Sequence, residues 1–92
     1  MSETIQKLEP NTTYSIYSFR PIESKFGKTY VLEDNDFNKY WANNKITQYI
    51  NRSKFKIDPF NNKLLFKIKT GNYKTYIHND KEIKFLEMNI FN

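Results

Sequence analysis

The hydrophobic core of this chain has to be built mainly from aromatic side chains and isoleucine. The 92 residues include eight Phe, seven Tyr and one Trp, whereas Leu, Val and Ala are scarce. Aromatic and β-branched residues are typical of strands because they pack well on a pleated, half-buried surface. A chain of this length forms one small domain. The composition therefore predicts a single mainly β domain that spans residues 1–92.

Strand patterns recur along the chain and are interrupted once by helical spacing. Alternating, β-branched and aromatic stretches predict strands at 12–20, 28–34, 36–42, 63–70, 71–78 and 81–91, with a turn at Gly71 between the fourth and the fifth. For 36–42 a helix is the alternative. Ile46, Tyr49 and Ile50 recur at helical spacing, which predicts a short helix over about 44–52 with Asn43 or Asn44 as N-cap. We expect residues 1–11 to be a flexible leader and residues 21–27 to be a connection. Residues 54–62 should form a loop or a partial strand that is broken at Pro59.

The order of these elements is three strands, a short helix and two or three further strands. This order matches the OB fold, a five-stranded barrel, closed or partly closed, in which one short helix fills the gap after strand three. A small sandwich or an SH3-like barrel is the alternative architecture.

The sequence Gly27-Lys28-Thr29 invites comparison with a phosphate-binding P-loop. That motif requires a glycine five positions before the one that precedes the lysine, and Ile22 occupies this position. A nucleotide-binding loop is therefore excluded. We expect Gly27 instead to let the backbone turn between two curved strands, where a Cβ would be awkward.

Residues 14–50 carry a recognisable succession of short patterns. A strand with aromatic and basic residues is followed by Ser-Lys-Phe-Gly at 24–27, an apolar strand with an acidic turn, and Phe37-x-x-x-Trp41 before the helix. This succession resembles the front half of small OB-fold single-stranded DNA-binding proteins of eukaryotic viruses and mobile elements. The resemblance implies an OB fold, sequence-tolerant binding of single strands in replication or recombination, and no catalysis.

The charge balance points to the same class of partner. Fifteen Lys and Arg residues against ten Asp and Glu give a net charge of +5, and basic domains of this size attract polyanions such as nucleic acid. A solvated, Lys-rich surface that keeps the protein soluble is the alternative explanation.

Single strands bind to grooves that combine cations for the phosphates with aromatic rings for the bases. Both kinds of side chain are interleaved on the first three predicted strands and again over 63–76. The predicted nucleic-acid-binding residues are Tyr17, Phe19, Arg20, Lys25, Phe26, Lys28, Tyr30, Lys39, Trp41, Lys67 and Tyr73. Of these, we expect the four cations before residue 40 to hold phosphates and Phe26, Tyr30 and Trp41 to stack on bases. About half of the strand aromatics must point into the core instead, and the spacing alone leaves the register open.

Catalysis and metal binding have little support in the sequence. The chain has no Cys and a single His, His78, in a turn-like setting. The acidic turn at 33–36 lacks the spacing of a calcium loop and has the residues that tight turns favour. We therefore predict no enzyme activity, no metal and no cofactor.

The expected partner is single-stranded DNA, with RNA as a second possibility, and association into homo-oligomers through the C-terminal strand is compatible with one small domain. We expect an intracellular location and no membrane segment, because the sequence lacks a signal-like or membrane-spanning apolar run. A small protein-interaction or inhibitor domain with exposed aromatics is the alternative function.

Overall fold

The computed structural model describes residues 4–25, 27–55 and 63–92. In chain order its elements are β1 (Ile5–Gln6), β2 (Thr13–Ile16), β3 (Ser18–Ser24), β4 (Gly27–Glu33), β5 (Lys39–Trp41), α1 (Asn44–Arg52), β6 (Phe66–His78) and β7 (Lys81–Phe91). They form a four-stranded sheet in the order β1-β5-β4-β3 and a three-stranded sheet in the order β2-β6-β7. The prediction of a mainly β domain with one short helix is confirmed. Within the described residues neither sheet closes into a barrel.

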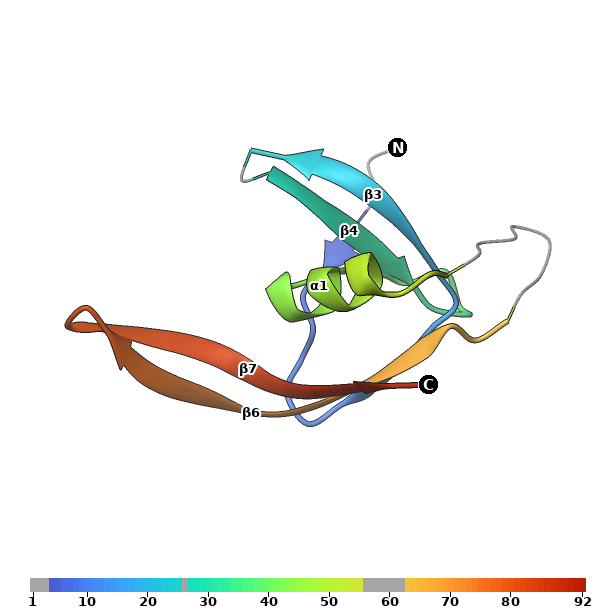
Figure 1. The fold of residues 1–92 in the computed structure, drawn as a ribbon. Coiled ribbons are helices and arrows are strands. Elements are labelled where there is room, and N and C mark those ends of the chain that lie inside the picture. The colour runs from blue at the N-terminus through green and yellow to red at the C-terminus, as the bar shows by residue number, and fades with distance from the viewer. Residues whose placement is uncertain (1–3, 26, 56–62) are drawn as a thin grey trace.

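β2 and β3 are two halves of one extended segment that passes from one sheet to the other. β2 pairs antiparallel with β6, and β3 pairs antiparallel with β4. At the junction, the N–H of Tyr17 donates to the carbonyl of Glu33 at 2.9 Å. The two sheets therefore spread apart from this shared segment, and α1 lies between the β3–β4 hairpin and the β6–β7 hairpin (Figure 1).

The hairpin between β3 and β4 corrects one predicted boundary. We expected a connection over 21–27, but Pro21–Ser24 belongs to β3. Proline is tolerated there because β3 is an edge strand that pairs with β4 alone in the described sheet. The predicted role of Gly27 is confirmed, since its φ is +111° and nothing lies within 4 Å of the position of a Cβ. Glycine is therefore required at position 27 by the positive φ of the backbone and not by a lack of space for a side chain.

β6 is longer than the sequence predicts. We expected a turn at Gly71, but the strand continues to His78 through a bulge between Thr70 and Tyr73. Gly71 lies within this bulge, where an added Cβ would approach the end of the flexible Glu87 side chain at 3.0 Å. The chain instead reverses in the short turn that joins β6 to β7.

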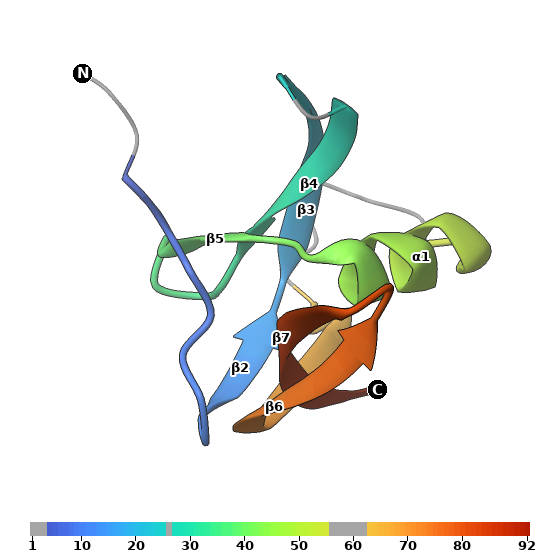
Figure 2. The same ribbon diagram turned by 90° about the vertical axis from the view of Figure 1, so that its left-hand side faces the viewer.

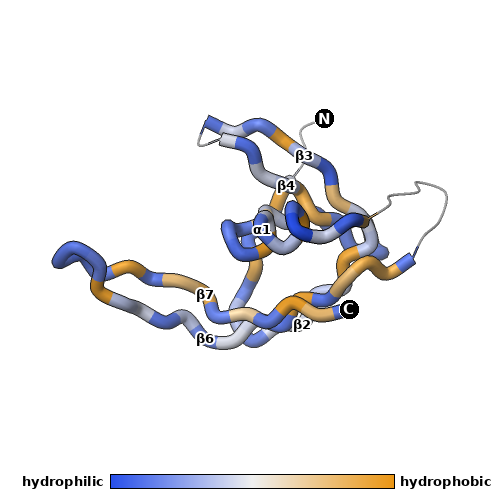
Figure 3. Tube along the Cα trace, in the orientation of Figure 1, coloured by the Kyte–Doolittle hydropathy of each residue, from blue (hydrophilic) through white to orange (hydrophobic). Residues whose placement is uncertain are grey.

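The reversal occurs at Asn79 and Asp80, whose φ values of 51° and 60° suit a two-residue hairpin turn. Beyond the bulge, residues 72–87 extend past the rest of the molecule, and we call this part of the hairpin the arm (Figure 1). The tips of the β3–β4 and β6–β7 hairpins are both hydrophilic (Figure 3).

The helix forms where the sequence predicts it. The side chain of Asn43 caps α1 by accepting from the N–H of Ile46 at 2.9 Å, and Ile46 and Ile50 are buried. The ring of Tyr49 packs edge-on against Phe66 at 5.3 Å between centroids. α1 therefore covers the core between the two sheets. The buried core consists of Leu8, Tyr14, Ile16, Leu32, Tyr40, Ala42, Ile46, Ile50, Phe66, Ile68 and Met88.

Residues 4–12, most of them predicted to be a flexible leader, take part in the fold. β1 pairs in parallel with β5, and Leu8 is buried in the core. This segment runs along the side of the molecule opposite α1 (Figure 2). Its far end is held by Thr70, whose hydroxyl donates to the carbonyl of Glu9 at 2.6 Å and accepts from the N–H of Thr12 at 2.9 Å. Of the predicted loop over 54–62, residues 56–62 lie outside the described residues.

Replacing Thr70 with Val tests this attachment. The side chain is 2% exposed, so the variant keeps the shape but leaves the Glu9 carbonyl and the Thr12 N–H without this partner. We expect the free energy of unfolding to fall by about 1–3 kcal/mol in a urea titration. Thr75→Val on the exposed arm is the control and should stay within about 0.5 kcal/mol of wild type. Equal stabilities of the two variants would contradict the assignment.

Candidate nucleic-acid interface

One row of side chains crosses three strands on the outer face of the first sheet. Arg20, Val31 and Trp41 stand directly opposite one another on β3, β4 and β5. They lie on the face of the sheet opposite to the adjacent Leu32 and Tyr40 of the same strands, which belong to the core. Val31 is only 2% exposed, while Trp41 remains half-buried.

Trp41 also stands where two hollows of the surface meet. The first, which we call the tip hollow, has a volume of about 410 Å³ and lies beside the tip of the β3–β4 hairpin. Lys25 and Lys28 line its outer end, and Asn44 and Thr47 of α1 line its inner side.

The second hollow, which we call the arm groove, has a volume of about 570 Å³ and separates Trp41 from the arm. Its walls come from the N-terminal segment, the β5–α1 junction and both strands of the arm. The lining residues are Lys7, Leu8, Trp41, Ala42, Asn43, Asn44, Lys45, Tyr73, Tyr76, Ile83, Lys84, Phe85, Leu86 and Met88. They include four aromatic rings and three lysines but no carboxylate.

Contacts within the arm orient these aromatic rings. The ammonium of Lys84 lies 4.5 Å from the centroid of the Tyr73 ring, a cation–π contact. Tyr76 and Phe85 meet at 5.6 Å between centroids with an interplanar angle of 61°. Tyr73, Tyr76 and Phe85 each keep more than two fifths of their surface exposed. By strand parity Tyr73 and Lys84 project from one face of the arm, and Tyr76 and Phe85 project from the other. The arm therefore presents aromatic surface on both faces, with a cation beside Tyr73.

The structure brings together some of the predicted binding residues. Lys25, Lys28 and Trp41 line the tip hollow, and Tyr73 joins Trp41 in the arm groove. Arg20 lies in the same row as Trp41, and by strand parity Lys39 is on that same face.

Other predicted residues lie elsewhere. Phe19 and Tyr30 are on the core side, where their rings meet at 5.4 Å and the Tyr30 hydroxyl donates to Asn51 of α1 at 2.7 Å. Tyr17 occupies the β2–β3 junction. Lys67 points to the face of the second sheet away from the core, since the adjacent residues of β6 are buried. The remaining predicted residue, Phe26, lies outside the described residues.

Four residues of the arm groove were not predicted as binding residues from the sequence: Lys7, Lys45, Lys84 and Phe85. Phe85 and Lys84 were assigned to a last strand without a site, because the predicted turn at Gly71 concealed the length of the hairpin. Lys7 was placed in the leader. The Lys74 ammonium, part of the basic run over 63–76, pairs with the Glu87 carboxylate at 2.5 Å and does not line the groove.

A polar network at the β4–β5 turn positions the strand that carries Trp41. One carboxylate oxygen of Asp34 accepts from the N–H groups of Asp36 and Asn38 at 2.9 Å. The other oxygen accepts from the Asn38 side chain at 3.0 Å and from the Tyr40 hydroxyl at 3.2 Å. Tyr40 adjoins Trp41 on β5, so the network fixes the register from which Trp41 projects.

The same network shifts two ionisation equilibria. Partial burial works to raise the pKa of the Asp34 carboxyl, but the hydrogen bonds from Asn38, Asp36 and Tyr40 outweigh it and hold that pKa below the usual 3.8. Burial and then the neighbouring Asp34 carboxylate raise the pKa of Tyr40 to about 12. The hydroxyl thus stays protonated and able to donate.

Asp34→Asn should reduce the sensitivity of the protein to acid. The pKa of Asp34 is lower in the folded than in the unfolded chain. The stabilisation of the fold by the Asp34 carboxylate is therefore complete at a pH above the unfolded pKa, and it is lost as the pH falls through the folded pKa. We expect the free energy of unfolding to drop less in the variant than in wild type between about pH 6 and about pH 2.5. Asp80→Asn in the arm turn is the control, and a wild-type-like drop for Asp34→Asn would contradict the prediction.

The described residues contain no group of three or more His, Cys, Asp or Glu that could hold a metal ion. In the same part of the chain, no helix has the length and apolar character that crossing a membrane would require. Comparison with protein-family models, with curated proteins and with solved structures finds no match for this chain.

Proposed function

We propose that the protein binds single-stranded nucleic acid, in the first instance DNA, with little sequence preference. The observation that carries the proposal is the lining of the arm groove, where Trp41, Tyr73, Tyr76 and Phe85 accompany three lysines without a carboxylate. Base stacking on aromatic rings and phosphate contacts with cations are the two interactions by which sequence-tolerant proteins hold single strands. A groove with both and with no negative charge suits that ligand.

The strand order supports the same proposal. Read through the shared β2–β3 segment, the strands follow the order β5, β4, β3/β2, β6, β7, with α1 between β5 and β6. This is the order of an OB fold whose barrel is left open between β5 and β7, and we propose that the fold is of this kind. The arm groove then lies at the opening, and the arm corresponds to the hairpin that flanks the binding face.

The path of the strand follows from the two hollows that meet at Trp41. The tip hollow offers Lys25 and Lys28, and the arm groove offers Lys84 beside Tyr73. A strand that crosses Trp41 would thus have cations on both sides of the central ring. Stacking makes no demand on base identity, which accounts for the proposed lack of sequence preference.

The proposal is tested first by titrating a fluorescently labelled single strand of ~15 nucleotides with the protein at low and high salt. We expect affinity for the single strand to fall steeply as salt rises, because phosphate contacts release counterions. Duplex DNA and an RNA strand of the same sequence run in parallel and decide between the nucleic acids. Trp41 is the only tryptophan of the chain, so quenching of its emission reports directly on the central ring.

Trp41→Ala and Tyr73→Ala should each weaken single-strand binding about 5- to 150-fold, which corresponds to about 1–3 kcal/mol for a lost stacking contact. Phe37→Ala is the matched control, because Phe37 is an aromatic residue 77% exposed outside both hollows. Circular dichroism verifies that Trp41→Ala folds, and Tyr73→Ala tests the groove independently of packing against Val31.

The absence of binding at low salt, or an affinity that does not respond to salt, would contradict the proposal. Salt-insensitive binding to another protein through Ile77 and the arm aromatics would favour the protein-interaction alternative, since Ile77 is 78% exposed.

A further inference from the structure

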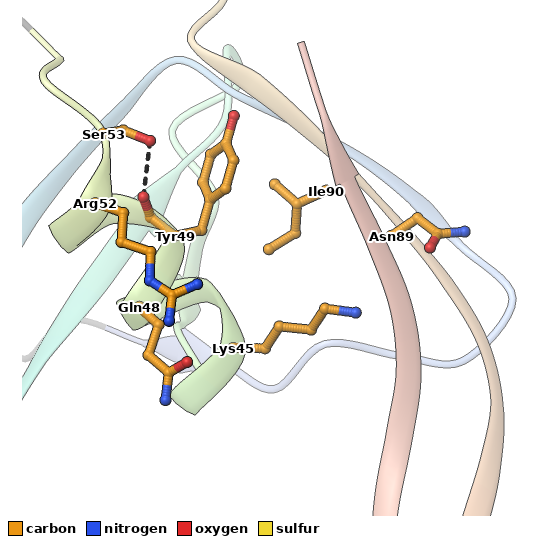
Figure 4. A pocket seen from close by; sticks show the side chains of 7 residues that line it. All are labelled: Lys45, Gln48, Tyr49, Arg52, Ser53, Asn89 and Ile90. Carbon is orange, nitrogen blue, oxygen red and sulfur yellow. Dashed lines mark hydrogen bonds between the residues drawn. The ribbon is translucent and has the colours of Figure 1, made fainter.

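A third hollow lies on the other side of α1, between the helix and the C-terminal half of β7. Its volume is about 530 Å³, and we call it the α1–β7 trough. The lining residues are Lys45, Gln48, Tyr49, Arg52, Ser53, Asn89 and Ile90. Figure 4 shows Lys45 extended from the helix toward β7 and Ile90 pointing back toward the helix, whereas the Asn89 side chain points away across the strand.

Polar helix side chains form one wall of the trough. Lys45, Gln48 and Arg52 are three and four positions apart, so they share one face of α1 over roughly 10 Å. The wall carries two cations, and no carboxylate lines the trough. The hydroxyl of Ser53 donates to the Tyr49 carbonyl at 2.7 Å, so this carbonyl oxygen already has a hydrogen-bond donor at the end of the helix (Figure 4).

The opposite wall is the edge of β7 that β6 does not cover. The N–H of Thr70 is directed to Thr12, away from β7, so the facing pair of Thr70 and Met88 exchanges no hydrogen bonds. The Met88 carbonyl accordingly faces the trough side, where it accepts from the ammonium of Lys45 at 2.6 Å. Ile90 follows two positions later and presents its N–H at the same edge.

Lys45 connects the trough to the arm groove, because it lines both hollows. Its place in the first turn of α1 is unfavourable for the helix, whose N-terminal end carries partial positive charge, and that turn contains no acidic residue. The helix alone therefore does not explain a lysine here. Its contacts do, since it bonds to β7 and keeps two further donors at the junction of the two hollows.

We propose that the phosphodiester backbone of a bound single strand continues from the arm groove past Lys45 into the α1–β7 trough, where Arg52 contacts a phosphate. This inference rests on the proposed function and lengthens its site, so that the strand wraps around the start of α1. A phosphate suits the trough because the guanidinium, the ammonium and the backbone N–H are all donors to an anion.

The test compares Arg52→Gln with Lys69→Gln on two labelled single strands, one of ~6 and one of ~15 nucleotides. Both substitutions remove one positive charge from an exposed side chain, but Lys69 lies on the face of β6 away from the core and lines none of the three hollows. Thermal unfolding establishes that both variants are folded.

We expect Arg52→Gln to weaken binding of the longer strand several-fold. It should also lower the slope of log affinity against log salt by about 0.7, the value for one phosphate contact of a single strand. Binding of the shorter strand, which the arm groove accommodates, should not change. Arg52→Lys should restore the salt slope because it keeps the charge. Lys69→Gln should leave both strands and the slope as in wild type.

The inference is overturned if Arg52→Gln behaves like Lys69→Gln on both strands while Trp41→Ala still weakens both. That pattern would confine the strand to the arm groove and leave the proposed function intact. If the wild-type protein binds neither strand at low salt, the proposed function and the trough are overturned together.

Discussion

One extended segment, from Thr13 to Ser24, takes part in both described sheets, because it pairs with β6 at one end and with β4 at the other. On the far side no strand pairing joins β5 to β7 in the described chain, so side chains have to connect the sheets. α1 supplies Ile46 and Ile50 to the core, Lys45 bonds to the Met88 carbonyl, and the N-terminal segment covers the remaining side. Because side chains rather than strand pairing close the gap between β5 and β7, hollows can remain on the surface there.

The same residue types fill the core and line the groove, and strand parity decides which role each one has. On β5, Tyr40 points into the core and its hydroxyl donates a hydrogen bond to Asp34. The next residue, Trp41, lies on the opposite face, beside Val31. On the arm no second layer exists, so Tyr73 and Phe85 remain exposed on both of its faces. A chain poor in Leu and Val thus acquires aromatic surface as a direct consequence of how its core is built.

Local signals were sufficient for the helix and for one turn. The spacing of Ile46 and Ile50 predicted α1 over about 44–52, with Asn43 or Asn44 as its N-cap, and Gly27 predicted a turn. A lone glycine within a strand pattern was ambiguous, because Gly71 serves a bulge rather than a turn. The groove could be anticipated only in part. Trp41 and Tyr73 come together through a long-range arrangement of β5 and the arm, and one sequence leaves the register of such strands open.

The position of the charges separates a general basic surface from a candidate site. Lys74 is neutralised by Glu87 on the arm, whereas Lys84 lies over the Tyr73 ring and faces the groove. A positive charge distributed for solubility would have no reason to avoid carboxylates in hollows that aromatic rings also line. Three adjoining hollows around the start of α1 have cations and no Asp or Glu in their walls. Because screening weakens isolated surface charges, the proposed binding of a polyanion relies on the closeness of these cations to one another around the arm groove.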